Sequence, residues 1–382
     1  MKYFLIAGEA SGDLHGSNLM KGILKSDTEA VFRFYGGEKM LAAGGTMARH
    51  FKELALMGIW EVFKNLKKFS GFIEECKADI LKFEPDVLIL IDYAGFNLRI
   101  AKFGKHNNIP VFYYISPKLW AWGKSRAIRI RRYVDRMFVI LPFEVAFYKK
   151  LRIEAAYYGN PVVDVIEEFK ANYHETKEVF RARHQIGEKP VIALLAGSRK
   201  QEIDLCLPLM INASKAFTGF SFVLAGASSI PEDYYKHFLE GTGIHLVYDE
   251  TYPLLKHAFA AVVTSGTATL ETALMNVPEV VIYKTSNASF YLGQFFIMLG
   301  VIHVKFFCLV NIILDRMHVK EFLQFNLSDK IKKELKRIVD DEVYRKKILD
   351  GYTEMKDMLE KPVVSERVAK KMVEYMVSWK KS

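Results

Sequence analysis

The chain has 382 residues, which is too long for one ordinary domain and suits two, at roughly 150 residues per domain. Apolar residues make up 51% of the chain and charged residues 26%, which excludes a disordered or collagen-like protein. The net charge is +10, and the three cysteines are too few for a disulfide framework and lack the spacing of metal ligands.

The chain opens with an apolar run, Tyr3–Ala7, which is too short for the hydrophobic region of a signal peptide. We therefore expect a cytosolic protein that begins with a buried strand. Similar runs alternate with helix-length segments along the chain, as is typical of parallel strands buried on both faces. The further predicted strands are Val87–Ile91, Val111–Ile115, Met137–Leu141, Val191–Leu195, Phe222–Leu224, Ala261–Thr264 and Val280–Tyr283.

These strands form two sets, separated by the charged segment 165–189, which has no strand character. The pattern predicts two parallel α/β domains, residues 1–164 and 165–327. From residue 328 the chain is rich in Lys, Glu and Asp, with apolar residues at helical spacing. This predicts terminal helices over residues 328–382.

The first predicted strand leads into the loop GEASGDLHG, residues 8–16. In an open parallel sheet, loops at the carboxyl ends of the strands form the ligand crevice. The loop lacks the G-x-G-x-x-G pattern of dinucleotide sites. Glu9 and Asp13 would repel a phosphate there but could accept hydrogen bonds from sugar hydroxyls. The structural alternative is that Asp13 caps a helix.

Asp92 directly follows the very apolar strand 87–91. A carboxylate that a buried strand carries into a cleft between domains is partly desolvated. Desolvation raises the pKa of a carboxylate toward the range of a useful general base. The alternative is that Asp92 caps the next helix.

Two polar loops follow strands of the second set. Gly197, Ser198 and Arg199 combine a glycine, a helix N-terminus and an arginine fork, which is a ready phosphate site. The turn after strand 261–264 is uncharged and rich in hydroxyls, which suits a diphosphate; its residues are Ser265, Gly266, Thr267 and Ala268. Glu271, one turn later, suits the two hydroxyls of a ribose. We therefore expect a nucleotide in the second domain and a sugar-like partner in the first.

The stretch Lys118–Arg152 contains ten basic residues against Asp135 and Glu144, a net +8. Such an excess indicates nucleic acid, anionic lipid headgroups or a phosphorylated substrate, or simply a solvated helix face. Trp120 and Trp122 stand beside it, and tryptophan next to clustered Arg and Lys fits the edge of an anionic lipid surface.

Apolar residues repeat at helical spacing over 57–69, at Trp60, Phe63, Leu66 and Phe69. Core packing is the default for such a stripe, but its three lysines make an interfacial membrane helix a close alternative. A second apolar segment, Phe290–Phe307, is interrupted by polar residues and falls short of the ~20 residues of a spanning helix. It predicts a buried helix or a membrane-contacting surface.

Taken in order, the motifs resemble those of the lipid-A-disaccharide synthases over residues 3–323. They are GEASGDLHG, ELALMGIWEV, IDYAGFN, SPKLWAWGKSR, LPFE, GNPVVD, LAGSRKQEI, TSGTATLE and LVNIIL. The resemblance implies an inverting glycosyltransferase of the GT-B fold, with two Rossmann-like α/β domains facing a central cleft and C-terminal helices. Such enzymes join UDP-2,3-diacylglucosamine to 2,3-diacylglucosamine 1-phosphate (lipid X). They release UDP and form lipid A disaccharide 1-phosphate, at the cytoplasmic face of the inner membrane of Gram-negative bacteria.

The resemblance assigns the first domain to the acceptor and the membrane, and the second to UDP. It implies that Asp92 is the base for the acceptor hydroxyl and that Arg199, Glu271 and Asn311 serve the UDP moiety. The residues expected around the acceptor are Glu9, Ser11, Gly12, Asn97, Ser116, Trp122 and Arg126. The residues expected to contact lipid are Met57, Ile59, Trp60, Phe63, Leu66 and Phe69.

The sequence departs from the family pattern at Ala196 and Val310, where many members have proline, and at Asn160, where many have histidine. The first two change loop stiffness, and we make no catalytic claim for Asn160. No Asp-x-Asp pair lies near a nucleotide loop, so we expect no metal and no cofactor.

Two other functions fit part of the pattern. A UDP-sugar 2-epimerase would share the fold and the UDP site, but would not need Trp60, Trp122 or the basic stretch. A nucleic-acid-binding protein would leave Asp92 and both nucleotide loops unexplained, so we expect no nucleic acid partner. We expect peripheral binding to an anionic inner membrane, and the sequence is compatible with a homodimer without requiring one.

Overall fold

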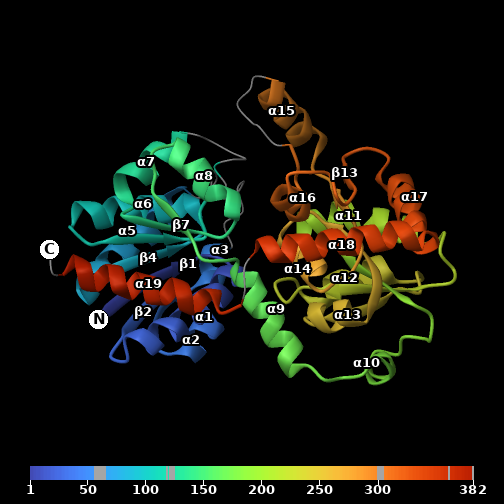
Figure 1. Ribbon diagram of the computed structural model, residues 1–382, viewed down its shortest axis with the longest axis horizontal. Helices are drawn as coiled ribbons and strands as arrows, with labels where there is room; N and C mark the ends of the chain where they lie inside the picture. Colours follow the sequence, from blue (N-terminus) through green and yellow to red (C-terminus); the bar gives the residue numbers. More distant parts are fainter. Residues whose placement is uncertain (56–65, 118, 120–124, 299–304, 360–361, 381–382) are drawn as a thin grey trace. The chain divides into compact units, whose positions relative to one another are not determined.

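The structure is a computed structural model that describes residues 1–55, 66–117, 119, 125–298, 305–359 and 362–380. The chain divides into two units, one made of Met1–Asp164 with Glu360–Ser382 and the other of Val165–Leu359. Each unit is built on one sheet (Figure 1), and every strand pair of the described residues is parallel. Two parallel α/β units are the predicted fold class, which the structure confirms.

The first unit holds a sheet of seven strands in the order β3-β2-β1-β4-β5-β6-β7. The strands are β1 Lys2–Ala7, β2 Val31–Gly36, β3 Thr46–His50, β4 Val87–Ile91, β5 Val111–Tyr114, β6 Arg136–Val139 and β7 Ala155–Tyr157. Its helices are α1 Ala10–Ser26, α2 Glu38–Ala43, α3 Phe51–Ala55, α5 Leu66–Phe83, α6 Ala94–His106, α7 Ser125–Tyr133, α8 Pro142–Lys150 and α19 Val364–Trp379. The helix α9, Pro161–Asn172, crosses from this unit into the next.

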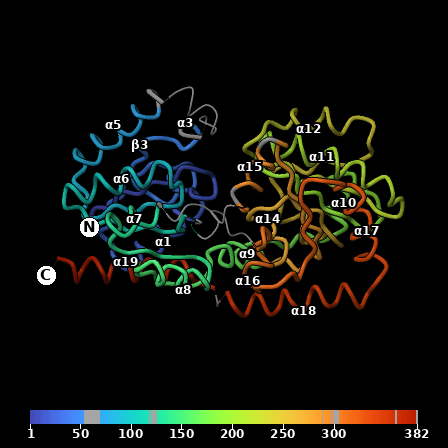
Figure 2. Tube along the Cα trace, turned by 90° about the horizontal axis from the view of Figure 1, so that it is seen from above, coloured from blue at the N-terminus to red at the C-terminus, as the bar shows by residue number. Residues whose placement is uncertain are grey.

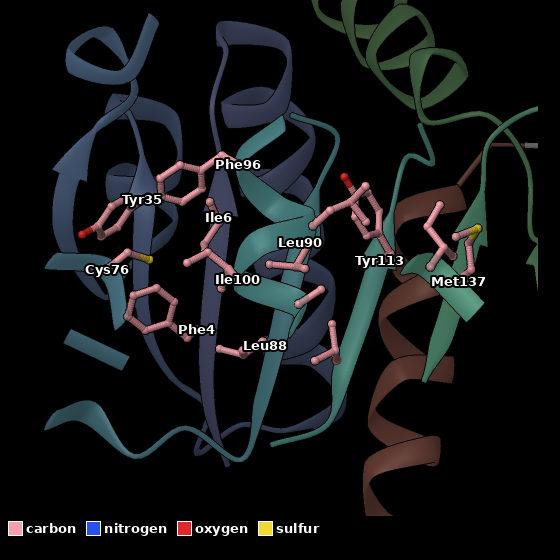
Figure 3. Close-up of a cluster of buried hydrophobic side chains, with 14 of the residues drawn as sticks. Phe4, Ile6, Tyr35, Cys76, Leu88, Leu90, Phe96, Ile100, Tyr113 and Met137 are labelled. Atoms are coloured by element: carbon pink, nitrogen blue, oxygen red, sulfur yellow. The ribbon is translucent and has the colours of Figure 1, made fainter. Parts of the chain in front are cut away.

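Alternate residues of β1 and β4 face opposite sides of the sheet, so both sides carry apolar cores. On one side Phe4, Ile6, Leu88 and Leu90 pack against α5 and α6 through residues such as Ile100 (Figure 3). On the other side the sheet packs against α1, α2 and α19. This explains why β1 and β4 read as continuous apolar runs in the sequence.

The second unit holds six strands in the order β10-β9-β8-β11-β12-β13. The strands are β8 Val191–Leu195, β9 Ser221–Gly226, β10 His245–Tyr248, β11 Ala258–Thr264, β12 Glu279–Tyr283 and β13 Glu321–Leu323. Its helices are α10 Lys177–Arg183, α11 Lys200–Ser214, α12 Glu232–Leu239, α13 Thr251–His257, α14 Thr267–Leu274, α15 Asn287–Met298, α16 Leu309–Leu314, α17 Leu327–Asp340 and α18 Glu342–Met358.

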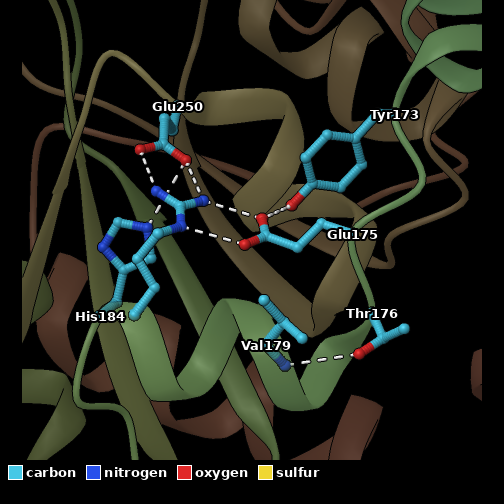
Figure 4. Close-up of polar contacts among 7 residues, drawn as sticks. Tyr173, Glu175, Thr176, Val179, His184 and Glu250 are labelled. Carbon is cyan, nitrogen blue, oxygen red and sulfur yellow. Dashed lines mark hydrogen bonds and ion pairs between the residues drawn. The ribbon is translucent and has the colours of Figure 1, made fainter.

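The segment that opens the second unit is fastened by an ion-pair cluster at α10 (Figure 4). Thr176 caps the helix by accepting a hydrogen bond from the Val179 N–H at 3.4 Å. Arg183 donates to both oxygens of Glu250, at 2.6 Å each, and to Glu175 at 2.8 and 3.0 Å. The hydrogen bonds from Arg183 lower the pKa of Glu175 to about 2. Residues of the charged segment 165–189, at the domain junction, therefore cap α10 and form its ion pairs.

Residues 328–382 form helices as predicted, but these helices do not make one separate segment. The helices α17 and α18 belong to the second unit, whereas α19 belongs to the first and packs against α1 (Figure 2). Asp164 caps α19 by accepting hydrogen bonds from the backbone N–H groups of Val364 and Ser365, at 2.9 and 2.8 Å. The apolar face of α19 is buried because the first sheet needs a second covering layer.

Candidate functional site

In each unit, the candidate site lies where the strand order reverses. The order β3-β2-β1-β4 in the first sheet changes direction between β1 and β4, and the order β10-β9-β8-β11 in the second changes direction between β8 and β11. Ligands of open α/β sheets bind at such switch points, outside the carboxyl ends of the strands. The register aligns these ends, since Ala7 pairs with Ile91 and Leu195 with Val263. The loops chosen from the sequence therefore lie side by side within each unit.

After β1, the N-cap residue Glu9 is exposed; in the first turn of α1, Ser11 is exposed and Gly12 is buried against Ala7. A Cβ atom at Gly12 would lie 3.1 Å from the Ala7 Cβ, so the glycine allows α1 to pack closely on its strand. Asp13 is buried and accepts hydrogen bonds from the backbone of Gly37 at 2.7 Å and of Met40 at 3.1 Å. It therefore caps the neighbouring helix α2, and the structural alternative for Asp13 is the correct one.

Asp92 sits at the end of β4 in a left-handed backbone conformation, with φ of 45°, and Tyr93 shares that conformation. The Asp92 carbonyl accepts hydrogen bonds from the Asn97 amide at 2.8 Å and from the Tyr113 hydroxyl. Tyr93, not Asp92, is the N-cap residue of α6. The Asp92 side chain is exposed within the first unit, and its desolvation in a cleft stays a prediction.

The Tyr93 ring fills the space over Gly8, where a Cβ atom would overlap it. This contact joins the loop after β1 to the loop after β4. It explains why the first loop begins with glycine, and it places the exposed Glu9 on the same edge of the sheet as Asp92.

Two residues expected to contact the acceptor are buried and bind backbone or core groups instead. Asn97 has no exposed surface, and its amide nitrogen lies within 3.4 Å of the carbonyls of Ile6, Ile91 and Asp92. Ser116 is 5% exposed and donates its hydroxyl to Glu144 at 2.9 Å. Both side chains therefore fix loops of the first unit, and their contact with the acceptor stays a prediction.

Other residues of this unit can also be assigned. Asn160 is buried, donates to the Ile140 carbonyl and accepts from the Val162 N–H, both at 3.0 Å, so it fixes the start of α9. Arg126 is exposed on α7, near the buried Tyr113. Trp122 lies outside the described residues.

In the second unit, the loop after β8 turns at Gly197, whose φ of 113° favours glycine. A Cβ atom there would lie 2.7 Å from the Cβ of Glu202. The Glu202 carboxylate accepts a hydrogen bond from the Ser198 N–H at 3.1 Å, and its other oxygen lies 3.5 Å from Arg199. An internal carboxylate thus occupies the N-terminus of α11, which indicates that this position attracts anions.

The loop after β11 presents the N-terminus of α14. Gly266, the N-cap residue, is in extended conformation and provides no side-chain cap, and Thr267 is exposed. Ser265 donates its hydroxyl to the Phe307 carbonyl at 2.7 Å, while Ala268 is half-buried. This first turn carries no charged side chain, so its N–H groups suit a phosphate.

Glu271 is held by a residue that the sequence analysis missed. The Tyr252 hydroxyl, from α13, donates to Glu271 at 2.8 Å. Burial raises the pKa of Glu271, and the hydrogen bond from Tyr252 opposes part of that rise. No local sequence signal links positions 252 and 271, because only the packing of α13 near α14 brings them together.

Asn311 was expected to complete the nucleotide side, and the structure gives it another role. It is fully buried, its Oδ1 accepts from His318 and Val319 at 2.7 and 3.0 Å, and its Nδ2 donates to the Val319 carbonyl at 2.9 Å. Both ends of the amide thus hold the loop after α16, and nucleotide contact by Asn311 stays a prediction.

The residues expected to contact lipid fall into two groups. Phe69 is 8% exposed and packs edge to face on Phe96 at 6.0 Å, so it belongs to the core and not to a lipid surface. The others lie outside the residues whose side chains are described: Met57, Ile59, Trp60, Phe63 and Leu66. Within the described parts of the chain, every helix is too short or too polar to cross a bilayer.

Among solved structures, the chain resembles several sugar-nucleotide proteins. It matches the Staphylococcus aureus MnaA–UDP structure with a TM-score of 0.66 and 14% identity, covering 98% of this chain and 96% of that one. It matches the UDP-GlcNAc 2-epimerase of Neisseria meningitidis with a TM-score of 0.65 and 12% identity, covering 98% and 100%. At these identities the likeness establishes the fold alone. The two parallel α/β units and the likeness to these solved structures place the protein in the GT-B fold class.

The chain belongs to the lipid-A-disaccharide synthetase family, whose model matches residues 3–373. The lipid-A-disaccharide synthase of Syntrophus aciditrophicus is 36% identical, over 96% of this chain and 95% of that protein. Those of Geobacter metallireducens and Myxococcus xanthus are 35% and 33% identical, over 96% and 98% of this chain and 95% and 97% of theirs. The protein is therefore a glycosyltransferase of lipid A biosynthesis with a sugar-nucleotide and a lipid as substrates, and the resemblance seen in the sequence is confirmed.

Proposed function

We propose that the enzyme transfers diacylglucosamine from UDP-2,3-diacylglucosamine to 2,3-diacylglucosamine 1-phosphate, giving lipid A disaccharide 1-phosphate and UDP. One observation carries this proposal: a family match over residues 3–373 in which each sheet presents its motif loops at its switch point. The first unit would hold the acceptor and the second unit UDP.

The reaction is a single displacement with inversion. Asp92 accepts the proton of the acceptor hydroxyl as that oxygen bonds to the anomeric carbon of the donor. The bond from the same carbon to the UDP oxygen breaks, and UDP leaves with the electron pair. Arg199 and the N-terminus of α14 stabilise the negative charge that develops on the diphosphate. Glu271, oriented by Tyr252, accepts hydrogen bonds from the ribose hydroxyls.

Membrane binding at the cytoplasmic face of the inner membrane belongs to the same proposal. The described helix α7 exposes Arg126, Arg129, Arg131 and Arg132 together with Ile128, which is 63% exposed, and contains no acidic residue. Each basic residue near an anionic bilayer contributes about 1 kcal/mol, which salt screens. Electrostatic binding of this kind would hold the enzyme at the bilayer surface, where its lipid substrates lie.

The direct test is to incubate the protein with UDP-2,3-diacylglucosamine and the acylated acceptor, and to follow UDP release and product mass. We expect a disaccharide only when both substrates are present. Conversion of UDP-N-acetylglucosamine alone into its 2-epimer would instead establish the epimerase function and overturn the proposal.

The variant Asp92→Asn tests the catalytic assignment. We expect kcat to fall by at least the ~100-fold that general base catalysis contributes. UDP affinity, measured by calorimetry, should stay unchanged because Asp92 belongs to the other unit. Weaker UDP binding with normal turnover would contradict the assignment.

A further inference from the structure

The helix α15 of the second unit is apolar and exposed to an unusual degree. Residues 287–298 contain no charged side chain. Leu292 is 56% exposed, Ile297 44% and Met298 76%, and Tyr291 is 62% exposed. In Figure 1 the helix, drawn in orange, extends away from the sheet of its unit. Exposed apolar patches of this kind mark interaction surfaces.

The base of α15 is fixed by a buried polar clamp. Gln324 is 4% exposed and donates to the Thr285 carbonyl at 2.9 Å and to Asn287 Oδ1 at 2.8 Å. Its Oε1 accepts from the Thr285 N–H at 3.2 Å. Phe290, in the first turn, packs edge to face on Phe325 at 5.3 Å. The clamp joins the start of the helix to Gln324, the residue that follows β13.

Both ends of the segment that carries α15 return to the nucleotide loop. Before the helix, the Ile282 carbonyl accepts a hydrogen bond from the Ser265 N–H at 2.8 Å. After it, the Phe307 carbonyl accepts from the Ser265 hydroxyl at 2.7 Å. The helix α15 therefore lies between two chain segments that both bond to Ser265, in the loop before α14.

We propose that α15 inserts into the apolar layer of a lipid bilayer, so that the second unit takes its acylated donor directly from the membrane. This rests on the proposed function, in which the donor carries acyl chains. A diphosphate at α14 and hydrocarbon at α15 would match the two ends of such a molecule. At 1.5 Å per residue the helix is roughly 18 Å long, shorter than the ~30 Å hydrocarbon core, so it enters the bilayer without crossing it.

The distribution of the exposed side chains favours lipid over a groove in a protein partner. At 100° per residue, Tyr291 and Met298 share one face of α15. Relative to Tyr291, Leu292 lies about 100° around the helix in one direction and Ile297 about 120° in the other. A helix that docks in a groove presents one apolar stripe and keeps a polar face for solvent. A helix with exposed apolar side chains on several sides suits a lipid bilayer, because lipid can contact all of these sides at once.

The test compares the full-length protein with the triple variant Leu292→Ser, Ile297→Ser and Met298→Ser. The probe is sedimentation with vesicles of pure phosphatidylcholine in high salt, where binding through the arginines of α7 is screened. The matched control carries Val179→Ser and Val343→Ser, two side chains of the same unit that are 55% and 81% exposed. We expect the triple variant to bind at least about tenfold more weakly, and the control to bind as the wild type does.

Unchanged UDP affinity in the triple variant, measured by calorimetry, would show that it is folded. Absence of wild-type binding to phosphatidylcholine, or equal binding by the triple variant, would overturn the proposal. So would a loss of self-association in the triple variant at unchanged vesicle binding, because a second copy of the chain would then cover α15. If no disaccharide forms but vesicle binding still depends on α15, the proposed function fails while the membrane role of α15 stands.

Discussion

Asp92 and Tyr93 both hold left-handed backbone conformations, which cost non-glycine residues about 1–2 kcal/mol each. The buried groups that bind the Asp92 carbonyl, Asn97 and Tyr113, stabilise this turn. They therefore fix the backbone that carries the Asp92 side chain, and under the proposed mechanism we regard them as positioning residues.

The variant Tyr113→Phe removes one of these hydrogen bonds and little volume. We expect kcat to fall about fivefold with an unchanged KM for the UDP-sugar, since a lost hydrogen bond of this kind is worth about 1 kcal/mol. Steady-state kinetics measure both constants. Tyr3→Phe is the matched control, because the Tyr3 hydroxyl donates to Asp27 at 2.9 Å at the opposite end of β1. An equal loss of kcat in the two variants would contradict the positioning role.

Three polar residues of the motifs have structural roles that the sequence did not reveal. Asn97, Ser116 and Asn311 look like ligand-binding residues, yet each is buried and bonded within its own unit. A side-chain amide binds a backbone carbonyl as readily as a ligand, and burial decides which it does. Burial is a property of the packed unit, so the motif letters alone could not reveal it.

Glu279, at the start of β12, is fully buried, and the Tyr352 hydroxyl lies beside its carboxyl group. Burial raises the pKa of Glu279 well above its usual range. In the unfolded chain this carboxyl loses its proton near pH 4.3, whereas in the folded chain it keeps the proton to higher pH. The stability contributed by the neutral group is therefore present at low pH and is lost as pH rises toward the folded pKa.

Glu279→Gln removes this titration while keeping the shape of the side chain. We expect the variant to gain stability relative to the wild type between pH 5 and pH 8, by about 1.4 kcal/mol for each pH unit over which the folded carboxyl stays protonated. Urea unfolding at several pH values measures the difference. A difference that does not change with pH would mean that the carboxyl ionises normally in the fold.

At the scale of the elements, α1 and α19 approach each other closely at Gly22. A Cβ atom at Gly22 would lie 2.9 Å from the Cβ of Ala369 and 3.0 Å from the Ser365 carbonyl oxygen. Glycine is needed at this position for packing, since its φ is not in the left-handed region.

Gly22→Ala should destabilise the first unit by about 1–3 kcal/mol, because the added methyl group overpacks the helix contact. The double variant with Ala369→Gly moves the methyl group to the other side of the interface and should recover part of the loss. Thermal unfolding of the single and double variants gives the coupling. Full additivity of the two substitutions would show that the helices do not meet as described.

Four of the five strands that the sequence did not reveal share one property. Of β2, β3, β7, β10 and β13, all but β2 are edge strands of their sheets. Edge strands are partly exposed and need no continuous apolar run, as the half-buried residues of β7 and β13 show. The central strands are buried on both faces, so their apolar runs were visible in the sequence.

At the scale of the molecule, the chain returns to its first unit only through α19. Six buried side chains of this helix cover one face of the first sheet: Val364, Val368, Ala369, Met372, Val373 and Met376. Fully burying one large apolar side chain contributes about 1.5–3 kcal/mol, and a domain is stable by about 5–15 kcal/mol. The first unit therefore depends on the end of the chain.

A chain that ends at Leu359 should lose the structure of its first unit and keep that of its second. We expect hydrogen exchange to show loss of protection over β1 and β4, with protection retained over β8 and β11. UDP binding, which we assign to the second unit, should survive. Retained protection in β1 and β4 would show that α1 and α2 alone can cover that face.

The sequence by itself determined the class of the fold, the central strands, the loops at their carboxyl ends and the family. These properties depend on apolar runs and on glycine, charge and hydroxyl patterns that are local along the chain. Only the tertiary structure decided the edge strands, the return of α19, the roles of Asp13, Asn97 and Asn311, and the exposure of α15. Each of these depends on which distant residues cover a given side chain, and burial by distant residues leaves no local mark in the sequence.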